Sequence, residues 1–534
     1  MRRRTLLGGA VALTAAASIP GTLWLNGRAT AGSLSGADAK RGHLLRDKKF
    51  PAPTQSEETG ILIAGGGVAG LAAGWTLAEA GVTNFQLLEL EDQTGGNARS
   101  GESPVTRYPL GAHYLPIPNR EARALRHMLT KFGMISGEEG GKPVYDPYQL
   151  SADLQERLFW RGRWQEGLFP ATGLSDKDKA DRIAFDAAMA AYSAATGKDG
   201  RPAFAVPSAY SSADPAFTAL DDLSFAAWLD GKGWTSAILR AHIRYCCRDD
   251  YGTEPEATSA WAGIHYFAAR RGWAAGQSGD GELTWPEGNA RLTDAMAARF
   301  PDQIQRGRTV FAVHQEGHTV EVESYDHTRQ ISVRTKTRAL ILAMPHFVAV
   351  RVADIGPSKD FSYAPWVVAT LSVDQLPAGR GAMLAWDNVS TSSESLGYVV
   401  ATHQSRGSAQ GPSVLSWYLP LSREDPAAAR KRMLTTSLAD WQSLVRDDLI
   451  ALHPELAEQI RRIDIWHWGH GMIRPTPGFI NRTAPAARDR VKPPLFLAHS
   501  DLSGLSLFEE AQYRGVVAAE GAMRHLSYPH ESLI

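Results

Sequence analysis

The sequence predicts an α/β protein whose best-defined part is a Rossmann-like dinucleotide-binding unit. A short apolar run at 60–64 leads into a glycine triplet, and an apolar pattern with helical spacing follows at 71–80. A second apolar run at 85–88 then ends in Glu89. Strand, glycine triplet, helix, strand and terminal acid occur in the order that a βαβ dinucleotide site requires.

Each part of this unit has a physical role. The first glycine allows a tight turn, the second lets the backbone approach a pyrophosphate, and the third lets the helix pack closely on the strand. The free N–H groups and the dipole of the helix N-terminus favour the anion, and the acid accepts hydrogen bonds from the ribose. We therefore assign to a dinucleotide site Gly65, Gly67, Val68, Ala69, Gly70 and Glu89.

Further motifs follow the unit along most of the chain. They are Gly95-Gly96-Asn97-Ala98-Arg99, Leu110-Gly111-Ala112-His113-Tyr114, the segments 285–292 and 339–345, the apolar run 495–501 ending in Asp501, and the helical pattern 509–519. This ordered set resembles the flavin-containing amine oxidase superfamily, which includes monoamine and polyamine oxidases and protoporphyrinogen oxidase-like enzymes.

The resemblance implies FAD as the cofactor and gives roles to single residues. Gly95, Gly96 and Arg99 would run along the FAD diphosphate, and Gly111, Ala112 and His113 would lie against the flavin ring. Asp501 would bind the ribityl chain, while Val310 and Glu510 complete the expected FAD contacts. Two alternatives remain at this stage, because His113 can be a packing histidine and Asp501 a surface acid beside a helix. Asn97 stands where many members of the superfamily have arginine.

The first 31 residues read as a signal peptide. Arg2-Arg3-Arg4 precedes an apolar stretch that ends near Leu25, and Ala29-Thr30-Ala31 offers a cleavage site. The arginine pair followed by x-Leu-Leu suggests twin-arginine export, so the export machinery is an expected partner and the mature protein is expected to be periplasmic or secreted. An uncleaved membrane anchor is the alternative. Residues 32–56 are polar and read as a flexible leader.

Charge and cysteine content narrow the functional class. The 534 residues carry 56 basic and 57 acidic side chains, a balance that does not match a nucleic-acid-binding surface. The two cysteines, Cys246 and Cys247, are adjacent and cannot form an unstrained disulfide. Because no cysteine lies at 495–515, where some amine oxidases attach FAD covalently, we expect noncovalent FAD.

The scattered motifs predict two domains assembled from separate segments. We assign 57–120, 281–346 and 485–530 to the FAD-binding domain, and 121–280 and 347–484 to an α+β substrate domain. Helical spacing predicts helices over 121–132, 177–195, 225–245 and 434–452. Alternating apolar residues predict strands at 309–313, 319–323 and 331–335 in the first domain, and at 367–373 and 414–419 in the second.

Catalytic candidates lie in the aromatic and polar stretch 466–475. Trp468 offers a face for an amine carbon chain, and His467 or His470 can act as a base or orient the substrate; the alternative is a core strand with satisfied side chains. Asp249 and Asp250 can pair with a cationic substrate, although an internal ion pair with Arg248 is the commoner arrangement. Many amine oxidases carry a lysine on the strand that here reads 363–371, and this chain has none there.

These observations lead to one functional hypothesis with two alternatives. We expect an exported FAD-dependent oxidoreductase that oxidises an amine, with polyamines among the candidate substrates, by hydride transfer to flavin N5, with oxygen or a quinone as electron acceptor. The missing lysine favours a dehydrogenase. One alternative is an FAD-dependent desaturase or isomerase of an isoprenoid or carotenoid-like substrate. The other is a non-catalytic flavoprotein that assists assembly of an exported partner.

Overall fold

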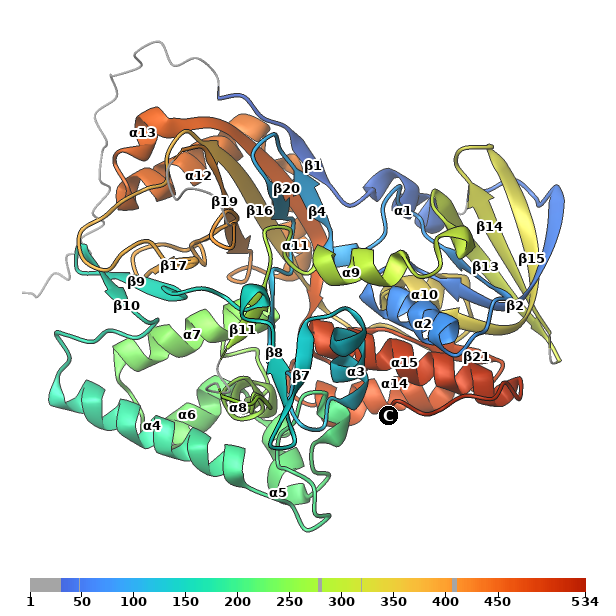
Figure 1. Cartoon of the computed structure of the whole chain (residues 1–534), viewed down its shortest axis with the longest axis horizontal. Helices are drawn as coiled ribbons and strands as arrows, with labels where there is room; N and C mark the ends of the chain where they lie inside the picture. The colour runs from blue at the N-terminus through green and yellow to red at the C-terminus, as the bar shows by residue number, and fades with distance from the viewer. Residues whose placement is uncertain (1–29, 48, 277–280, 318, 406–410) are drawn as a thin grey trace, which may run out of the picture.

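The computed structural model describes residues 30–47, 49–276, 281–317, 319–405 and 411–534. Two sheets organise the chain, and the polypeptide passes between them several times (Figure 1). The predicted signal peptide lies outside the described residues, apart from Thr30 and Ala31.

The first sheet carries the βαβ unit and has the strand order β12-β3-β2-β15-β14-β13, with β21 beside the C-terminal half of β15. Strands β12, β3, β2, β15 and β21 run parallel, while β13, β14 and β15 form an antiparallel meander. Its strands are β2 (Gln55–Ala64), β3 (Phe85–Leu88), β12 (Ile304–Gln305), β13 (Arg308–Glu316), β14 (Thr319–Asp326), β15 (Ile331–Leu342) and β21 (Leu495–Leu497).

Helices surround this sheet. They are α2 (Val68–Glu79), α3 (Arg123–Lys131), α9 (Ala290–Ala297), α10 (His346–Val352), α14 (Ala484–Arg490) and α15 (Phe508–His525). Helices α2, α3, α9 and α15 share one apolar core with the sheet, α10 packs in a second cluster, and α14 packs beside two strands of the second sheet. Helix α15 lies against α2 so closely that a Cβ on Gly515 would come within 2.2 Å of the Ala69 carbonyl oxygen. This contact fixes the start of α2 relative to the C-terminal helix.

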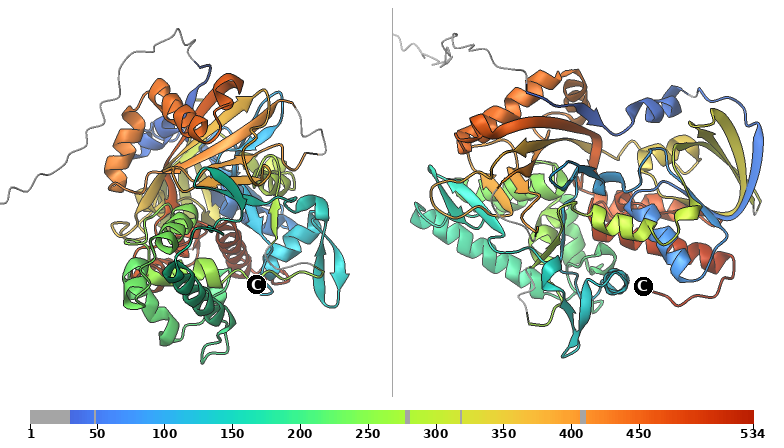
Figure 2. Two further views of the ribbon diagram at one scale, coloured as in Figure 1. Left: turned by 90° about the vertical axis from the view of Figure 1, so that its left-hand side faces the viewer. Right: turned by 45° about the horizontal axis from the view of Figure 1, so that its top comes forward.

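The second sheet has eight strands in the order β1-β20-β16-β19-β18-β17-β9-β10. These are β1 (Leu34–Gly36), β9 (Glu156–Trp160), β10 (Arg163–Glu166), β16 (Tyr363–Val373), β17 (Asp387–Ser390), β18 (Tyr398–Val400), β19 (Ser413–Pro420) and β20 (Ile460–Ile473). Strand β20 is long and curved (Figure 2), and His470, Gly471 and Ile473 at its C-terminal end line a cavity together with the loop after β2.

Two groups of helices enclose the second sheet. On one face lie α11 (Pro426–Thr435), α12 (Leu438–Leu452) and α13 (Leu456–Gln459), with Trp441 buried against the strands. On the other side stand α4 (Asp176–Ala194), α5 (Pro215–Thr218), α6 (Phe225–Gly231), α7 (Ala237–Tyr251) and α8 (Ala260–Ala268), which have an aromatic core of their own.

The remaining elements are short and peripheral. Helix α1 (Ala39–Asp47) follows β1, and three two-stranded ribbons complete the chain: β4 (Ser100–Glu102) with β5 (Arg107–Pro109), β6 (Tyr114–Pro116) with β11 (Glu282–Thr284), and β7 (Ile135–Glu139) with β8 (Lys142–Tyr145). Within the described residues, no helix combines the length and apolar character needed to cross a membrane.

Three sequence predictions are wrong in detail. Residues 32–56 are not a flexible leader: β1 pairs with β20, and α1 is bonded to the loop after β3. The helix predicted over 225–245 is two helices, α6 and α7, separated at Gly233, whose φ of 73° ends the first. Residues 121–145 pack with the first domain, since Leu125 and Met128 of α3 share the core of α2 and α15.

Candidate functional site

Two cavities meet between the sheets. The glycine-rich cavity, of about 300 Å³, runs from Glu89 and Val310 past Gly65 and Gly67 to Asp501. The acidic cavity, of about 150 Å³, lies between the second sheet and helix α7. Both are lined by Asn97, Ala112, Trp468, Gly471, Ser506, Leu507 and Phe508. A molecule bound in the first cavity therefore faces the second.

The glycine loop leaves donors free for an anion. Gly65 has a φ of 114°, which only glycine adopts without strain, and no side chain caps the N-terminus of α2 at Gly67. Val68 and Ala69, the first residues of the helix, line the cavity. An uncapped helix N-terminus facing a cavity fits a phosphate group.

Glu89 ends β3 beside this loop. Its Oε2 accepts a hydrogen bond from Gly66 N at 2.6 Å, and its Oε1 accepts one from Glu91 N at 2.8 Å. Burial raises the pKa of the Glu89 carboxyl, and the two backbone N–H donors oppose that rise. The carboxylate is thus held rigidly where a ribose hydroxyl would reach it.

The second glycine motif closes over the first. Gly95 N donates to Gly66 O at 2.8 Å, and a Cβ on Gly96 would lie 3.2 Å from the Gly67 Cα. Arg99 follows, 3.1 Å from Glu91 and with its guanidinium 5.3 and 5.2 Å from the ring centroids of Trp466 and Trp468. These aromatic contacts fix the arginine along the cavity wall.

Asp501 lies at the far end of the glycine-rich cavity and is 1% exposed. Its Oδ2 accepts from Tyr363 OH at 2.6 Å and from His346 N at 2.9 Å, and Oδ1 lies 3.0 Å from His499 Nδ1. Burial alone would raise the pKa of Asp501, but these three partners lower it overall. The alternative of a surface acid is therefore wrong.

The acidic cavity carries more negative than positive groups. Its lining includes the carboxyls of Asp249, Asp250, Asp387 and Glu509 against a single guanidinium, that of Arg270. Arg270 Nη2 donates to both oxygens of Asp250, at 2.9 and 2.8 Å, so the guanidinium is already paired with that acid.

Burial dominates the titration of these acids. It raises the pKa of Asp249 to about 7, with the neighbouring Asp250 adding to the rise. It also raises the pKa of Glu509 to about 7 and that of Asp387 well above its usual value. A bound cation would lower all three pKa values, because it stabilises the ionised form.

Aromatic rings form the rest of the acidic cavity. Trp468, Trp366, Tyr418, Tyr114 and Tyr245 line it. His113 stacks on Tyr418 with 4.7 Å between ring centroids, and burial lowers its pKa to about 4. His113 is thus a neutral, packed ring that lines the acidic cavity, and its contact with a flavin ring stays a prediction.

Four predicted site residues lie outside both cavities. Gly70 packs on the loop, since a Cβ there would be 1.8 Å from Gly65 O, and Gly95 only shapes the second loop. Glu510 accepts a hydrogen bond from Ser208 N, on the side of α15 away from the cavities. His467 faces the opposite side of β20 from the cavities, where Trp441 packs on its ring; strand alternation separates it from Trp468.

The other predicted residues line one cavity or both. The glycine-rich cavity is lined by Gly65, Gly67, Val68, Ala69, Glu89, Gly96, Arg99, Ala112, Val310, Trp468, His470 and Asp501, and the acidic cavity by Gly111, Ala112, His113 and Trp468. His470 stacks on Phe347 with 4.3 Å between ring centroids.

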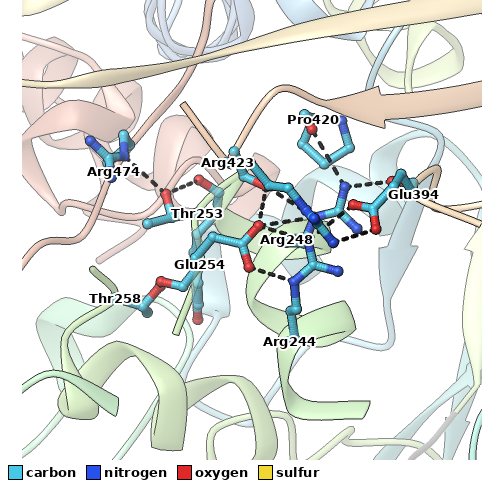
Figure 3. Close-up of polar contacts among 11 residues, drawn as sticks. Arg244, Arg248, Thr253, Glu254, Thr258, Glu394, Pro420, Arg423 and Arg474 are labelled. Atoms are coloured by element: carbon cyan, nitrogen blue, oxygen red, sulfur yellow. Dashed lines mark hydrogen bonds and ion pairs between the residues drawn. The ribbon is translucent and has the colours of Figure 1, made fainter. Parts of the chain in front are cut away.

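The expected internal ion pair forms at Asp250, but its partner is Arg270 and not Arg248. Neighbours in a helix point in different directions, so Arg248 faces away from the acidic cavity. It binds Ser422 Oγ at 3.0 Å and Glu394 O at 2.5 Å, next to the Arg244–Glu254 ion pair at 2.6 Å (Figure 3). This network fixes α7 to the loops after β17 and β19, and thereby places Asp249.

Sequence reasoning missed several lining residues. Asp387 and Glu509 were visible only as isolated acids, and Arg270 lies twenty residues from the acid it binds. Tyr114, Tyr363 and Tyr418 come from three separate strands or loops. A pattern search along the chain cannot join them; only the crossing of the two sheets does.

Comparison with known proteins identifies the fold. A family profile described as an NAD(P)-binding Rossmann-like domain matches residues 63–132. No curated protein sequence matches the chain. Putrescine oxidase bound to putrescine superposes with a TM-score of 0.63 at 15% identity, over 88% of this chain and 100% of that one.

Two further solved structures are similar. Cyclohexylamine oxidase from Brevibacterium oxydans IH-35A has a TM-score of 0.62 at 14% identity, covering 88% of this chain and 99% of that one. A fatty acid isomerase from P. acnes that produces CLA has a TM-score of 0.58 at 15% identity, covering 86% and 98%. The chain shares their fold. The predicted α/β architecture with a Rossmann-like dinucleotide unit is confirmed.

Proposed function

We propose that the protein is an exported FAD-dependent oxidoreductase that oxidises an amine, with a polyamine or diamine as the preferred class. The observation that carries the amine assignment is the acidic cavity, where four carboxyls face one guanidinium already bound to Asp250. The hydroxyls of Tyr114 and Tyr245 lie 3.4 Å from Asp249 and Asp387, but no ion pair neutralises these two carboxyls in the described residues. Buried carboxyls that lack a positive partner are costly, which supports a cation as the ligand of this cavity.

The hydrogen-bonding groups of the glycine-rich cavity fit FAD. The uncapped N-terminus of α2 suits a diphosphate, and Glu89 suits a ribose. The N-terminus of α15 is also uncapped at Leu507, on the boundary of both cavities, and suits the electron-rich edge of a flavin. Bound there without a covalent link, FAD would supply the oxidising power by accepting a hydride at N5.

The acids and rings would prepare the amine. Asp387 and Asp249 would attract the ammonium form, and the faces of Trp468 and Tyr418 would hold its carbon chain. Only the neutral amine can lose a hydride, so one carboxylate must take the ammonium proton. Asp249 and Glu509, each with a pKa of about 7 in the ligand-free protein, are the acceptors best matched to neutral pH.

The electron acceptor remains part of the proposal. Among the described residues, no lysine lines either cavity, in keeping with the lysine-free strand 363–371. This favours a dehydrogenase that passes electrons to a quinone, with oxygen as the alternative acceptor. Export by the twin-arginine route and a periplasmic or secreted location rest on the N-terminal sequence.

The test is anaerobic visible absorbance of the FAD-loaded protein during titration with putrescine, spermidine and butanol as a neutral control. We expect the amines to bleach the oxidised-flavin band and butanol to leave it unchanged. Asp387→Asn should weaken bleaching by putrescine at least tenfold, whereas Asp360→Asn, an exposed acid outside both cavities, should have no effect.

Each outcome assigns the function. Readmission of air separates an oxidase, which recovers its band, from a dehydrogenase, which does not. A yellow protein that no amine bleaches would refute the amine proposal and favour an isoprenoid desaturase or isomerase, or a role in assembly. A protein that cannot be loaded with FAD would refute the cofactor assignment.

A further inference from the structure

The N-terminal segment 30–47 binds to both sheets. At one end it adds a parallel strand to β20: Ile463 N donates to Ala31 O at 2.9 Å, and Ile465 N donates to Ser33 O at 2.8 Å. A Cβ on Gly32 would lie 1.8 Å from Ile463 O, so the two backbones touch. The pairing is specific, because glycine is needed for so close an approach.

At the other end, the start of helix α1 is hydrogen-bonded to the loop that follows β3. Asp38 N donates to Glu91 Oε1 at 2.9 Å, and Arg41 Nη1 donates to Leu90 O at 2.9 Å. Arg41 also forms an ion pair with Asp92 at 2.7 Å. This loop begins with Glu89, the expected ribose ligand, and Leu90 and Glu91 line the glycine-rich cavity.

The same helix supplies part of the cavity wall. Leu45 is 8% exposed, lines the glycine-rich cavity and belongs to the apolar cluster of Val310 and Val352. Phe50, just beyond α1, stacks on Phe311 with 4.4 Å between ring centroids. Figure 2 shows the segment passing from the second sheet to the meander of the first. It therefore spans the cavity's two walls.

We propose that residues 32–47, which remain after signal cleavage at Ala31, form a strap that belongs to the dinucleotide site and retains the cofactor by closing its Glu89–Val310 end. The inference rests on the proposed binding of FAD. The dinucleotide enters before the strap docks, and its release requires Leu45 and Arg41 to leave the wall. A segment that reads as a polar leader is thus a binding element.

The release rate of FAD tests the strap. We compare the full-length protein with Leu45→Ala, which removes wall contacts, and Arg41→Ala, which frees the loop after β3. Lys40→Ala, on the exposed side of the same helix, is the matched control. The FAD-loaded proteins are diluted, and release is followed by the rise in free-flavin fluorescence. We expect release at least tenfold faster from the Leu45 and Arg41 variants and unchanged from the control.

Trypsin digestion of the wild-type protein provides a second readout that needs no substitution. Lys40, Arg41 and Arg46 are cleavage sites within the strap. FAD should slow cleavage there at least tenfold, and inorganic phosphate should not. If FAD binds but neither release nor cleavage changes, the strap proposal is overturned while the cofactor assignment stands. If the wild-type protein binds no FAD, both are overturned.

Discussion

Replacing Asp249 by asparagine should stabilise the ligand-free protein, by an amount that grows as the pH rises from about 4 to 7. Burial raises the pKa of Asp249 from 3.8 to about 7. The folded protein therefore keeps a proton that the unfolded chain has lost, and the free energy of unfolding falls as pH rises from about 4 to 7. The amide of asparagine mimics the protonated acid and does not suffer this loss.

The magnitude follows from that difference of about three pH units. At 1.36 kcal/mol per unit, ionisation of Asp249 costs at most about 4 kcal/mol above pH 7. Since the cost is partly present at pH 5, the advantage of Asp249→Asn should grow by about 2–3 kcal/mol between pH 5 and pH 8. The coupling to Asp250 makes these values upper bounds for one carboxyl.

Urea titrations at pH 5 and pH 8, followed by tryptophan fluorescence in the absence of amine, measure this effect. Putrescine at pH 8 should stabilise the wild-type protein more than the variant, because the cation relieves the ionised acid. Asp360→Asn is the control and should show no pH-dependent difference. The reasoning is refuted if Asp249→Asn is no more stable than wild type at pH 8, or if its advantage is the same at both pH values.

Three further predictions concern the glycine loop, strand β20 and the N-terminus. Gly70→Ala should abolish FAD binding in an absorbance assay, because its Cβ would lie 1.8 Å from Gly65 O, whereas Gly42→Ala, with open space around it, should bind normally. His467→Phe should leave amine-dependent flavin reduction unchanged. It should also keep or raise the thermal midpoint, because the buried His467 Nε2 has no hydrogen-bond partner among the described residues. His470→Phe should slow flavin reduction, because His470 lines the glycine-rich cavity. If the proposed signal peptide is cleaved, mass spectrometry of protein produced in a host with twin-arginine export should find an N-terminus close to Gly32, with Ser33 and the residues after it retained. A chain that starts beyond Asp47 would contradict this.

The local parts of the fold were predictable because each has a short-range physical cause. The triplet Gly65, Gly67 and Gly70 has one structural solution between a strand and a helix, and β2, α2 and β3 form there. The strands of the meander follow their alternating apolar residues. The break between α6 and α7 depends on the positive φ of Gly233. Helical spacing does not reveal it, because the apolar pattern continues through both helices and predicts a single one.

The N-terminal segment shows what composition cannot reveal. Residues 32–56 have few apolar side chains, so no core would form from them alone. Their attachment combines backbone hydrogen bonds to β20, polar contacts of Asp38 and Arg41 with the loop after β3, and the packing of Leu45 and Phe50 on the first sheet. The partners on β20 lie more than four hundred residues away in the chain. One example is Asp464, whose carboxylate accepts a hydrogen bond from Ser33 Oγ at 2.7 Å. No local pattern records such a partner.

The acidic cavity gains its chemistry from the same long-range assembly. Asp249 comes from α7, Asp387 from β17 and Glu509 from α15, and each taken alone reads as an ordinary helix or strand acid. Beside Trp468, these three acids form a buried acidic site that adjoins the glycine-rich cavity. Because a folded protein rarely keeps three buried carboxyls without a compensating cation, the instability at Asp249 is best understood as the ligand-free cost of a cation-binding site. The pH dependence of Asp249→Asn therefore tests stability and substrate class in one experiment. If putrescine stabilises the wild-type protein at pH 8 and a neutral alcohol does not, the cost of ionising Asp249 is tied to the binding of a cation.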